Sequence, residues 1–328
     1  MNKLKSYFVT GSLLFAVACS DPSLSTKDDS LSVVEAATQR QCGAMTVLNE
    51  QLAADPSLQS RMDAIENHTQ KFIQAGGAAV ARINAAGKIE IPVIVNVLYR
   101  LAEDNISDAQ IQSQIDVLNE DYNATNTDVT KTPALFSGVV ADVDVQFVLA
   151  GVNRKYSSKR SWRTNDAMKK TSQGGLDPTD PAHNLNLWVV NNMGSILGYA
   201  QFPGGSPATD GVVIAHNYFG RVGVVSPPYH LGRTASHEVG HWMNLRHIWG
   251  DANCGNDFVS DTPVAQTSNF GCPSFPHVSA CGTDGHAEMT MNYMDYTDDA
   301  CMYMFSKGQK DRMLAIFASG GARAPIGQ

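Results

Sequence analysis

The chain has 328 residues, 43% of them hydrophobic, and its length allows one large domain or two small ones with a buried core. Its formal net charge of -8 argues against nucleic acid as the main partner, because phosphate binding requires clustered Lys and Arg side chains. No segment has the roughly 20 consecutive apolar residues of a membrane-spanning helix.

Residues 1–18 are predicted to be a signal peptide. The basic stretch "MNKLK" precedes an apolar run from about Tyr7 to Ala18, which is too short to span a membrane. The small residues "AVA" at the end of that run predict cleavage before Cys19. Alternatively, Cys19 could be the lipid-bearing first residue of a bacterial lipoprotein. In both cases we expect an exported protein, either secreted or attached to the outer surface of a bacterium.

Residues 19–60 are polar at first and then only weakly helical, and are predicted to be a linker and a prosegment. Helical spacing follows over 61–74, a strand rich in β-branched residues over 88–100, and a capped helix over 105–123. Further strands are expected at 143–151, 184–192, 197–203 and 210–220. This order predicts an α+β fold for residues 61–328, with a mixed, twisted sheet backed by helices.

The segment "HEVGHWMNLRHIWGD" carries the strongest signal for chemistry. His237 and His241 are four residues apart, so on a helix their imidazoles share one face and can reach one ion. His247 would point elsewhere if the helix continued, since each residue turns about 100°. Asn244 could end the helix, because Asn readily adopts the left-handed conformation, and so return His247 to the other two. We therefore expect zinc on the three histidines, with one position open for water.

Glu238 follows the first histidine and is the candidate catalytic residue. It would accept a proton from a water molecule that attacks a carbonyl, and later pass it to the leaving amine. An amphipathic helix with ordinary buried histidines is the competing interpretation. A thermolysin-like peptidase, whose third metal ligand is a downstream glutamate, is another.

Four cysteines follow the histidine motif, in a region after Gly250 that is rich in turn-forming residues. In an exported protein they are expected to form two disulfides that hold an irregular C-terminal subdomain together. A zinc site of four thiolates is the alternative, but it would need closely spaced pairs such as C-x2-C, which are absent. The sequence alone permits three pairings of Cys254, Cys272, Cys281 and Cys301.

These motifs resemble those of the metzincin metallopeptidases, whose extended signature is H-E-x-x-H-x-x-G-x-x-H. The chain departs from it only in having Asn244 in place of the glycine. The second metzincin hallmark, a methionine in a tight turn beneath the metal, is matched by Met294, whose thioether would form an apolar floor. Tyr296 stands where several metzincins have a tyrosine that contacts the metal or the developing oxyanion. A core aromatic is the alternative role for Tyr296.

Within the metzincins, the chain looks most like the pappalysin family, in its bacterial cytophagalysin branch, over roughly residues 91–317. The histidine segment, "CGNDFVSDTP" and "NYMDYTDD" carry this resemblance. It implies a cleft with zinc at its floor and a peptide bound in extended form along an edge strand, for which 197–203 is the candidate. It also implies disulfides between Cys254 and Cys281 and between Cys272 and Cys301.

The acidic loop "GDANCGNDFVSDTP" is a candidate calcium site. Asp257, Asp261 and Thr262 offer the hard oxygen ligands that calcium prefers, and the resemblance implies a structural calcium here. A solvated acidic turn is the alternative.

The prosegment contains "RQCGA", which matches an Arg-x-Cys-Gly element of the family's inhibitory prosegments. A thiolate is an excellent zinc ligand, so Cys42 would keep the enzyme latent by excluding the catalytic water. Pairing of this thiol with another molecule, or an incidental cysteine, is the alternative. Asp298 and Asp299 follow the methionine turn, in a segment that in metzincins shapes the pocket for the residue after the scissile bond. A buried carboxylate there would favour Arg or Lys. Self-cleavage between Ser60 and Arg61 would then release the prosegment.

The sequence thus predicts a secreted or surface-anchored zinc endopeptidase, made as a latent zymogen and acting on protein or peptide substrates as a monomer. A catalytically inactive binding or adhesin module on the same fold is the alternative. The presence of Glu238 together with all three histidines disfavours that alternative.

Overall fold

The structure is a computed structural model that describes residues 1, 37, 39–77 and 84–327. The predicted signal peptide beyond Met1, the lipid-attachment candidate Cys19 and the predicted linker up to residue 36 lie outside the described residues. Apart from Met1, everything described belongs to one compact unit, Val34–Gln328. Within these described parts, no helix has the length and apolar character needed to cross a membrane.

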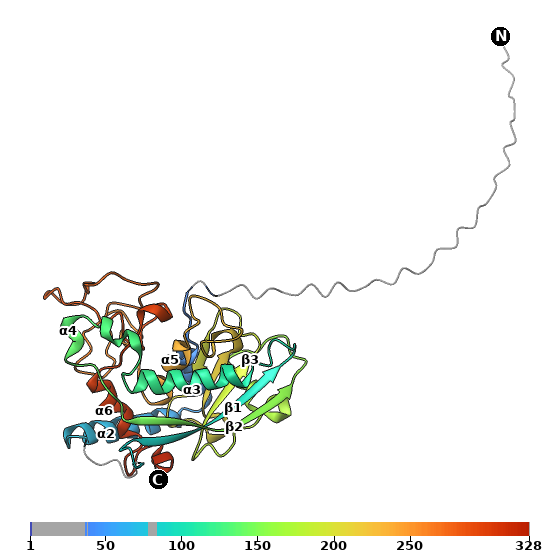
Figure 1. Cartoon of the computed structure of the whole chain (residues 1–328), viewed down its shortest axis with the longest axis horizontal. Helices are drawn as coiled ribbons and strands as arrows, with labels where there is room; N and C mark the ends of the chain where they lie inside the picture. The colour runs from blue at the N-terminus through green and yellow to red at the C-terminus, as the bar shows by residue number, and fades with distance from the viewer. Residues whose placement is uncertain (2–36, 38, 78–83, 328) are drawn as a thin grey trace. The chain divides into compact units, whose positions relative to one another are not determined.

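A five-stranded sheet in the order β2-β1-β3-β5-β4 forms the centre of the fold (Figure 1). β1, β2, β3 and β5 run parallel to one another, whereas β4 pairs antiparallel with β5 at one edge. All six residues of β3 are buried, as expected for a parallel strand covered on both faces. The mixed sheet predicted from the sequence is confirmed, and the expected edge strand lies at its edge. The strands are β1 (Ile89–Tyr99), β2 (Val145–Tyr156), β3 (Leu185–Val190), β4 (Gly198–Ala200) and β5 (Val212–Ala215).

Helices cover the sheet and position the histidine motif. The Ser107 side chain caps α3 by accepting a hydrogen bond from the Gln110 N–H, and α3 packs against β2 and α5. The α-helices are α1 (Ala44–Ala54), α2 (Ser57–Gln74), α3 (Asp108–Tyr122), α4 (Ala134–Ser137), α5 (Arg233–Trp242) and α6 (Lys307–Ala315). Short 3-10 helices are η1 (Thr127–Lys131), η2 (Ala167–Lys169), η3 (Thr171–Gln173), η4 (Pro207–Thr209), η5 (His216–Tyr218), η6 (Asp299–Cys301) and η7 (Ala324–Gly327).

The predicted boundary between prosegment and catalytic domain falls inside α2. The later turns of α2 pack on α6, where a Glu66 carboxylate oxygen lies 2.8 Å from an Arg312 guanidinium nitrogen. Its first turn instead places Leu58 in a small apolar cluster with residues of α1. One continuous helix therefore joins the two predicted regions, and a chain break after residue 60 would cut it near its start.

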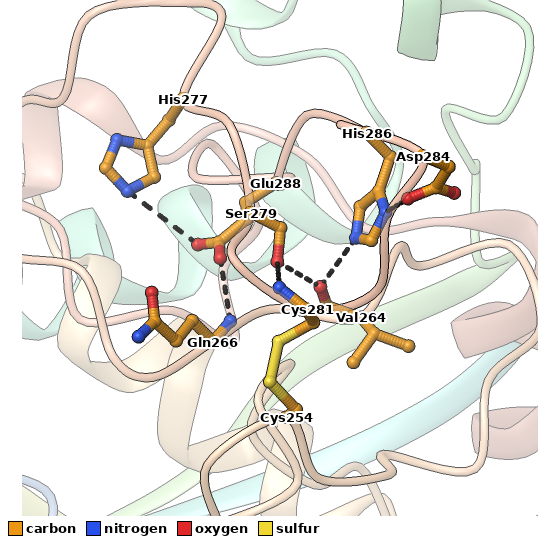
Figure 2. The surroundings of a disulfide bond; sticks show 9 residues. All are labelled: Cys254, Val264, Gln266, His277, Ser279, Cys281, Asp284, His286 and Glu288. Carbon is orange, nitrogen blue, oxygen red and sulfur yellow. Dashed lines mark hydrogen bonds and ion pairs between the residues drawn. A yellow bond between two sulfur atoms is a disulfide. The ribbon is translucent and has the colours of Figure 1, made fainter.

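The region between α5 and α6 is mostly turns, held by disulfides between Cys254 and Cys281 and between Cys272 and Cys301. These are the pairs that the family resemblance implies. Side chains satisfy the irregular backbone around the first of them (Figure 2): the Val264 carbonyl accepts from Ser279 Oγ at 2.9 Å and lies 2.8 Å from His286 Nε2, while Glu288 accepts from the Gln266 N–H at 2.7 Å.

Candidate metal centre

The chain leaves α5 through a left-handed residue, as the sequence predicts. Asn244 has a φ of +74°, and its N–H donates to the His241 carbonyl at 2.9 Å. The next N–H, of Leu245, donates back to the Gly240 carbonyl at 2.9 Å. This pair of hydrogen bonds closes the helix and reverses the chain, so that His247 returns to the face that carries the first two histidines.

The Nε2 atoms of the three histidines converge. His241 Nε2 lies 3.2 Å from His237 Nε2 and 3.1 Å from His247 Nε2. Each Nδ1 faces an acceptor, which assigns the ring proton to Nδ1 and leaves three Nε2 lone pairs pointing at one another. The acceptors are the carbonyl oxygens of Tyr293 (2.7 Å) and Leu245 (2.8 Å) and the carboxylate of Asp251 (2.5 Å).

Such an arrangement fits a bound cation. Lone pairs cannot hydrogen-bond to each other, but ligands held at about 2.0 to 2.1 Å around tetrahedral zinc lie about 3.3 Å apart. Burial lowers the pKa of His237 well below its ordinary value and that of His241 to about 3, and neighbouring imidazoles add to the effect. Both rings are therefore neutral, which is the form that binds metals.

Cys42, which lies just before α1, completes the cluster. Its Sγ and the three histidine nitrogens all lie within 4.8 Å of one another, and no other group of three or more candidate ligands is found among the described residues. The thiol also contacts Glu238 Oε2 at 3.3 Å. Burial, with the nearby Glu238 charge, raises the pKa of Cys42 well above its ordinary value. A bound cation would oppose both effects and favour the thiolate.

Glu238 lies between the histidine cluster and the edge strand, and its side chain is 1% exposed. Burial raises the pKa of its carboxyl to about 8, while the Cys42 hydrogen bond and the charge of Arg40 act in the opposite direction. The edge strand approaches closely at Gly198, where an added Cβ would lie 2.8 Å from the Val213 carbonyl and 3.2 Å from Glu238 Cγ. Only glycine therefore fits at this point of β4.

Met294 packs against α5, and Tyr296 lies beside the histidine rings. Met294 is fully buried, and its sulfur would lie 2.5 Å from a Cβ added to Gly240 of α5. The Tyr296 ring centroid is 4.9 Å from that of His247 and 5.7 Å from that of His237. Burial raises the pKa of Tyr296 above its ordinary value, so its phenol is a neutral hydrogen-bond donor.

The two predicted specificity carboxylates have different environments. Asp299 is fully buried and lies 2.5 Å from the Arg40 guanidinium, which also donates to the Thr297 carbonyl at 3.2 Å. The Leu231 N–H donates to the other Asp299 oxygen at 2.8 Å. Asp298 is half-buried, and burial raises the pKa of its carboxyl. The Arg40 guanidinium therefore fills a buried site at Asp299, a role for Arg40 that the sequence does not reveal.

The candidate calcium ligands separate into two groups. Thr262 Oγ1 donates to Asp257 Oδ2 at 2.7 Å, and burial raises the pKa of Asp257 to about 6. Asp261 instead accepts from Ser306 Oγ at 2.6 Å and from the Gly308 N–H at 2.9 Å, at the start of α6. Asp261 thus has a structural role at a helix end, which its place in an acidic loop does not predict.

Comparisons with known proteins agree with this site. A peptidase family model described as pregnancy-associated plasma protein-A matches residues 177–318. An extracellular metalloprotease of Pyricularia oryzae is 31% identical over 318 residues, covering 94% of this chain and 96% of the relative. A second, from Colletotrichum graminicola, is 33% identical over 294 residues, covering 85% and 90%.

Solved structures of Tannerella forsythia proteins share the fold. A promirolysin mutant superposes with a TM-score of 0.78 at 40% identity, covering 88% of this chain and 97% of its own. Mature mirolysin in complex with a cleaved peptide superposes with a TM-score of 0.71 at 44% identity, covering 73% and 96%. The proenzyme thus matches a larger share of this chain than the mature enzyme does.

Proposed function

Because this chain belongs to the pappalysin family of metalloproteases, we propose that it is a zinc endopeptidase that cuts extended peptides at the three-histidine centre. The fold, the family and the metalloprotease class predicted from the sequence are confirmed by these relationships. The observation that carries the proposal is the convergence of three Nε2 lone pairs beside the buried carboxyl of Glu238.

His237, His241 and His247 would hold the metal, and bound zinc would polarise the substrate carbonyl and favour loss of a proton from the attacking water. The buried Glu238 carboxylate takes up that proton and passes it to the leaving nitrogen, because it lies next to the histidine cluster where the water would be held. The neutral Tyr296 phenol donates a hydrogen bond to the oxygen on which negative charge develops.

The peptide would lie along β4. In the structure the prosegment uses this edge, because the Leu197 N–H donates to the Gln41 carbonyl and the Gly43 N–H donates to the Gly198 carbonyl, both at 2.9 Å. After the prosegment leaves, the same backbone groups are free to pair with a substrate backbone. The mature relative solved in complex with a cleaved peptide supports peptides as substrates of this fold.

We propose that the described chain is the latent form. The Cys42 sulfur lies within 4.8 Å of the three histidine nitrogens, where it would take the place of water on a bound metal. The proposed prosegment also pairs with the edge strand in parallel orientation at Gly198. Both the position for water and the substrate edge are therefore blocked. The similarity to a proenzyme structure supports this proposal.

We also propose that the enzyme prefers substrates with Arg or Lys after the scissile bond. The support is an arginine of the prosegment that lies on a buried carboxylate. Arg40 places its guanidinium on the buried Asp299 and over the Tyr229 ring, at 4.9 Å from the ring centroid. A substrate Arg in the same position would gain a shielded, charge-assisted pair and a cation–π contact. Arg fits these contacts better than Lys, because its planar group can use both the carboxylate and the ring.

We propose that a cut between Ser60 and Arg61 releases the prosegment. The structure sets a condition on this cut. The bond lies in the early part of α2, and Arg61 Nε donates to the Gly204 carbonyl at 2.7 Å. Since the edge strand takes up extended peptides, the start of α2 must unwind before this bond can be cut. N-terminal sequencing of the active enzyme would identify the cut.

We also propose a structural calcium in the acidic loop, near Asp257 and Thr262. The support is a buried carboxylate and hydroxyl pair at 2.7 Å. Added calcium should raise the melting temperature of the wild type but not that of Asp257→Asn. An unchanged wild-type melting temperature would remove the proposal.

Export through the signal peptide, with or without a lipid on Cys19, is proposed from the sequence and from relatives named extracellular metalloproteases. Mass spectrometry of the protein from its native cell would show a free or an acylated Cys19. A monomer is proposed as the active state, which sedimentation would test.

The function is tested with matured wild-type protein beside Glu238→Ala, using casein and a mixed peptide library with every cut site read by mass spectrometry. We expect cleavage by the wild type, inhibition by a zinc chelator, and loss of cleavage in the variant with zinc still bound. Equal cleavage by both proteins would exclude the role of Glu238. Zinc binding without any cleavage would favour an inactive binding module.

A further inference from the structure

A small apolar cluster lies between the prosegment and the edge strand. Phe202, which follows β4, is 3% exposed in this cluster, whose other core members are Ala44, Leu48 and Leu58. All three of these belong to α1 or to the first turn of α2, before the proposed cut at residue 60. Release of the prosegment would therefore remove most of the apolar cover of Phe202.

The direction of the prosegment places Phe202 on the far side of the metal centre from Asp299. Gln41 pairs with Leu197 and Gly43 with Gly198, so the prosegment and β4 run in the same direction. Residues after Gly43 follow the chain towards Phe202, whereas Arg40, which precedes them, reaches Asp299.

Phe202 belongs to the wall of the site and not only to the core. Its ring centroid lies 5.2 Å from that of the ligand candidate His241. On another side, the Arg246 guanidinium carbon lies 5.5 Å from the Phe202 ring centroid. Without α1, the ring would form an apolar floor bordered by a cation.

We propose that Phe202 forms a subsite for an apolar substrate side chain on the N-terminal side of the scissile bond, which α1 covers in the zymogen. This inference rests on the proposed function, because it takes Asp299 as the pocket for the residue after that bond. Residues before the bond then lie on the Phe202 side. The subsite selects Leu, Met or Phe, since these bury apolar area on the ring, and it disfavours Lys, which would meet the charge of Arg246.

The first test uses matured enzyme and peptides with Arg fixed after the scissile bond. Ala, Leu and Lys are placed in turn at each of the three positions before it, and kcat/KM is measured for the wild type, Phe202→Ala and Phe202→Leu. At one position we expect a Leu-over-Ala preference of about tenfold in the wild type, reduced to less than about threefold in Phe202→Ala and mostly kept in Phe202→Leu.

A preference that is the same in all three enzymes would overturn the subsite while leaving the peptidase intact. The absence of any cleavage by the wild type would instead overturn the proposed function. The two failures are therefore distinguishable.

A second test keeps the enzyme unchanged, so that folding of the variants is not in question. A synthetic peptide of residues 39–55 is added to matured wild-type enzyme as an inhibitor. Its Leu48→Ala form should inhibit about tenfold more weakly, whereas Asn49→Ala, at an exposed position of the same helix, should inhibit like the parent peptide. Equal inhibition by the Leu48→Ala and parent peptides would contradict the contact on which the subsite depends.

Discussion

Two stretches of the chain meet at the metal centre, and different interactions hold them. In the sheet segment, residues 89–242, parallel strands such as β3 are buried along their whole length. In the disulfide segment, residues 243–306, hydrogen bonds of buried polar side chains replace those of regular secondary structure. Asp295, for example, is fully buried and accepts hydrogen bonds from the Asn269 N–H and side-chain amide, both at 2.9 Å. Burial raises the pKa of Asp295 to about 7 despite these hydrogen bonds.

The two segments contribute different groups to the site. The sheet segment supplies the groups common to the chemistry, namely the edge at Gly198, Glu238 and two histidines on α5. The disulfide segment supplies the third histidine, together with Met294, Tyr296 and Asp299. Both segments thus contribute to the proposed chemistry, and the regular scaffold needs loops that the disulfides hold in place to complete the site.

The largest expected effect concerns the disulfide segment. Replacing Cys254 and Cys281 together by Ser removes a link between residues 27 apart, which should lower the free energy of unfolding by about 3 to 4 kcal/mol. Urea denaturation would measure the change. An unchanged midpoint would show that this disulfide adds nothing to the hold of the polar contacts and of the second disulfide, Cys272–Cys301, on this segment.

A smaller but more specific effect is expected at the proposed guanidinium pocket. Asp299→Asn should lower kcat/KM for peptides with Arg after the scissile bond by about 100-fold or more, because the buried charge pair is lost. Asp298→Asn is the matched control. It should change the same kcat/KM by less than about threefold, since no ion pair links Asp298 to Arg40 in the described structure. Equal losses in the two variants would contradict the assignment.

An effect on zinc affinity is expected at Asp251, whose carboxylate contacts the His247 ring. Asp251 accepts from His247 Nδ1 at 2.5 Å, so Asp251→Asn should weaken zinc binding by about 10- to 100-fold in competition with a chelator. The exposed pair of Asp284 and His286, at 2.7 Å, offers the control Asp284→Asn. Unaltered zinc affinity in Asp251→Asn would mean that the chain turn alone orients His247.

The smallest effect is expected where α2 meets α6. Burial alone would raise the pKa of Glu66, but the hydrogen bonds and charge of Arg312 outweigh it and hold the pKa below its ordinary value. The pair therefore contributes stability above the unfolded pKa of Glu66 and loses it as the pH falls through the lower folded value. Glu66→Gln should cost about 1 kcal/mol at pH 7, and the difference from the wild type should shrink towards pH 3. A difference that does not depend on pH would argue against the ion pair.

Several features of the fold could be predicted from the sequence because each has a local cause. Asn244 can adopt the left-handed conformation, and it does so at φ +74°. The start of α2 was harder to predict. Helical spacing predicts a helix from residue 61, whereas α2 begins at Ser57, directly after Pro56. Likewise β2 continues to Tyr156, past the apolar stretch that ends near residue 151, because its pairing with β1 extends through polar residues.

Contacts between distant residues could not be predicted in this way. Arg40 and Asp299 are 259 positions apart, and no periodic pattern links them. Phe202 ends an apolar strand and resembles any core aromatic until its neighbours across the cleft are known. Asp261 lies among other acidic residues, yet its oxygens cap α6. Each of these roles depends on which loop lies opposite, which is decided by the fold as a whole.

We propose that the Cys42 thiol and the three histidines share one metal ion in the latent form. X-ray absorption spectroscopy of the zinc-loaded zymogen tests it most directly, because sulfur and nitrogen ligands lie at different distances, about 2.3 and 2.0 Å from zinc. We predict one sulfur and three nitrogens, with the sulfur replaced by a light atom in Cys42→Ala and in the matured enzyme. A zymogen spectrum without sulfur, or one with several sulfurs, would contradict the account.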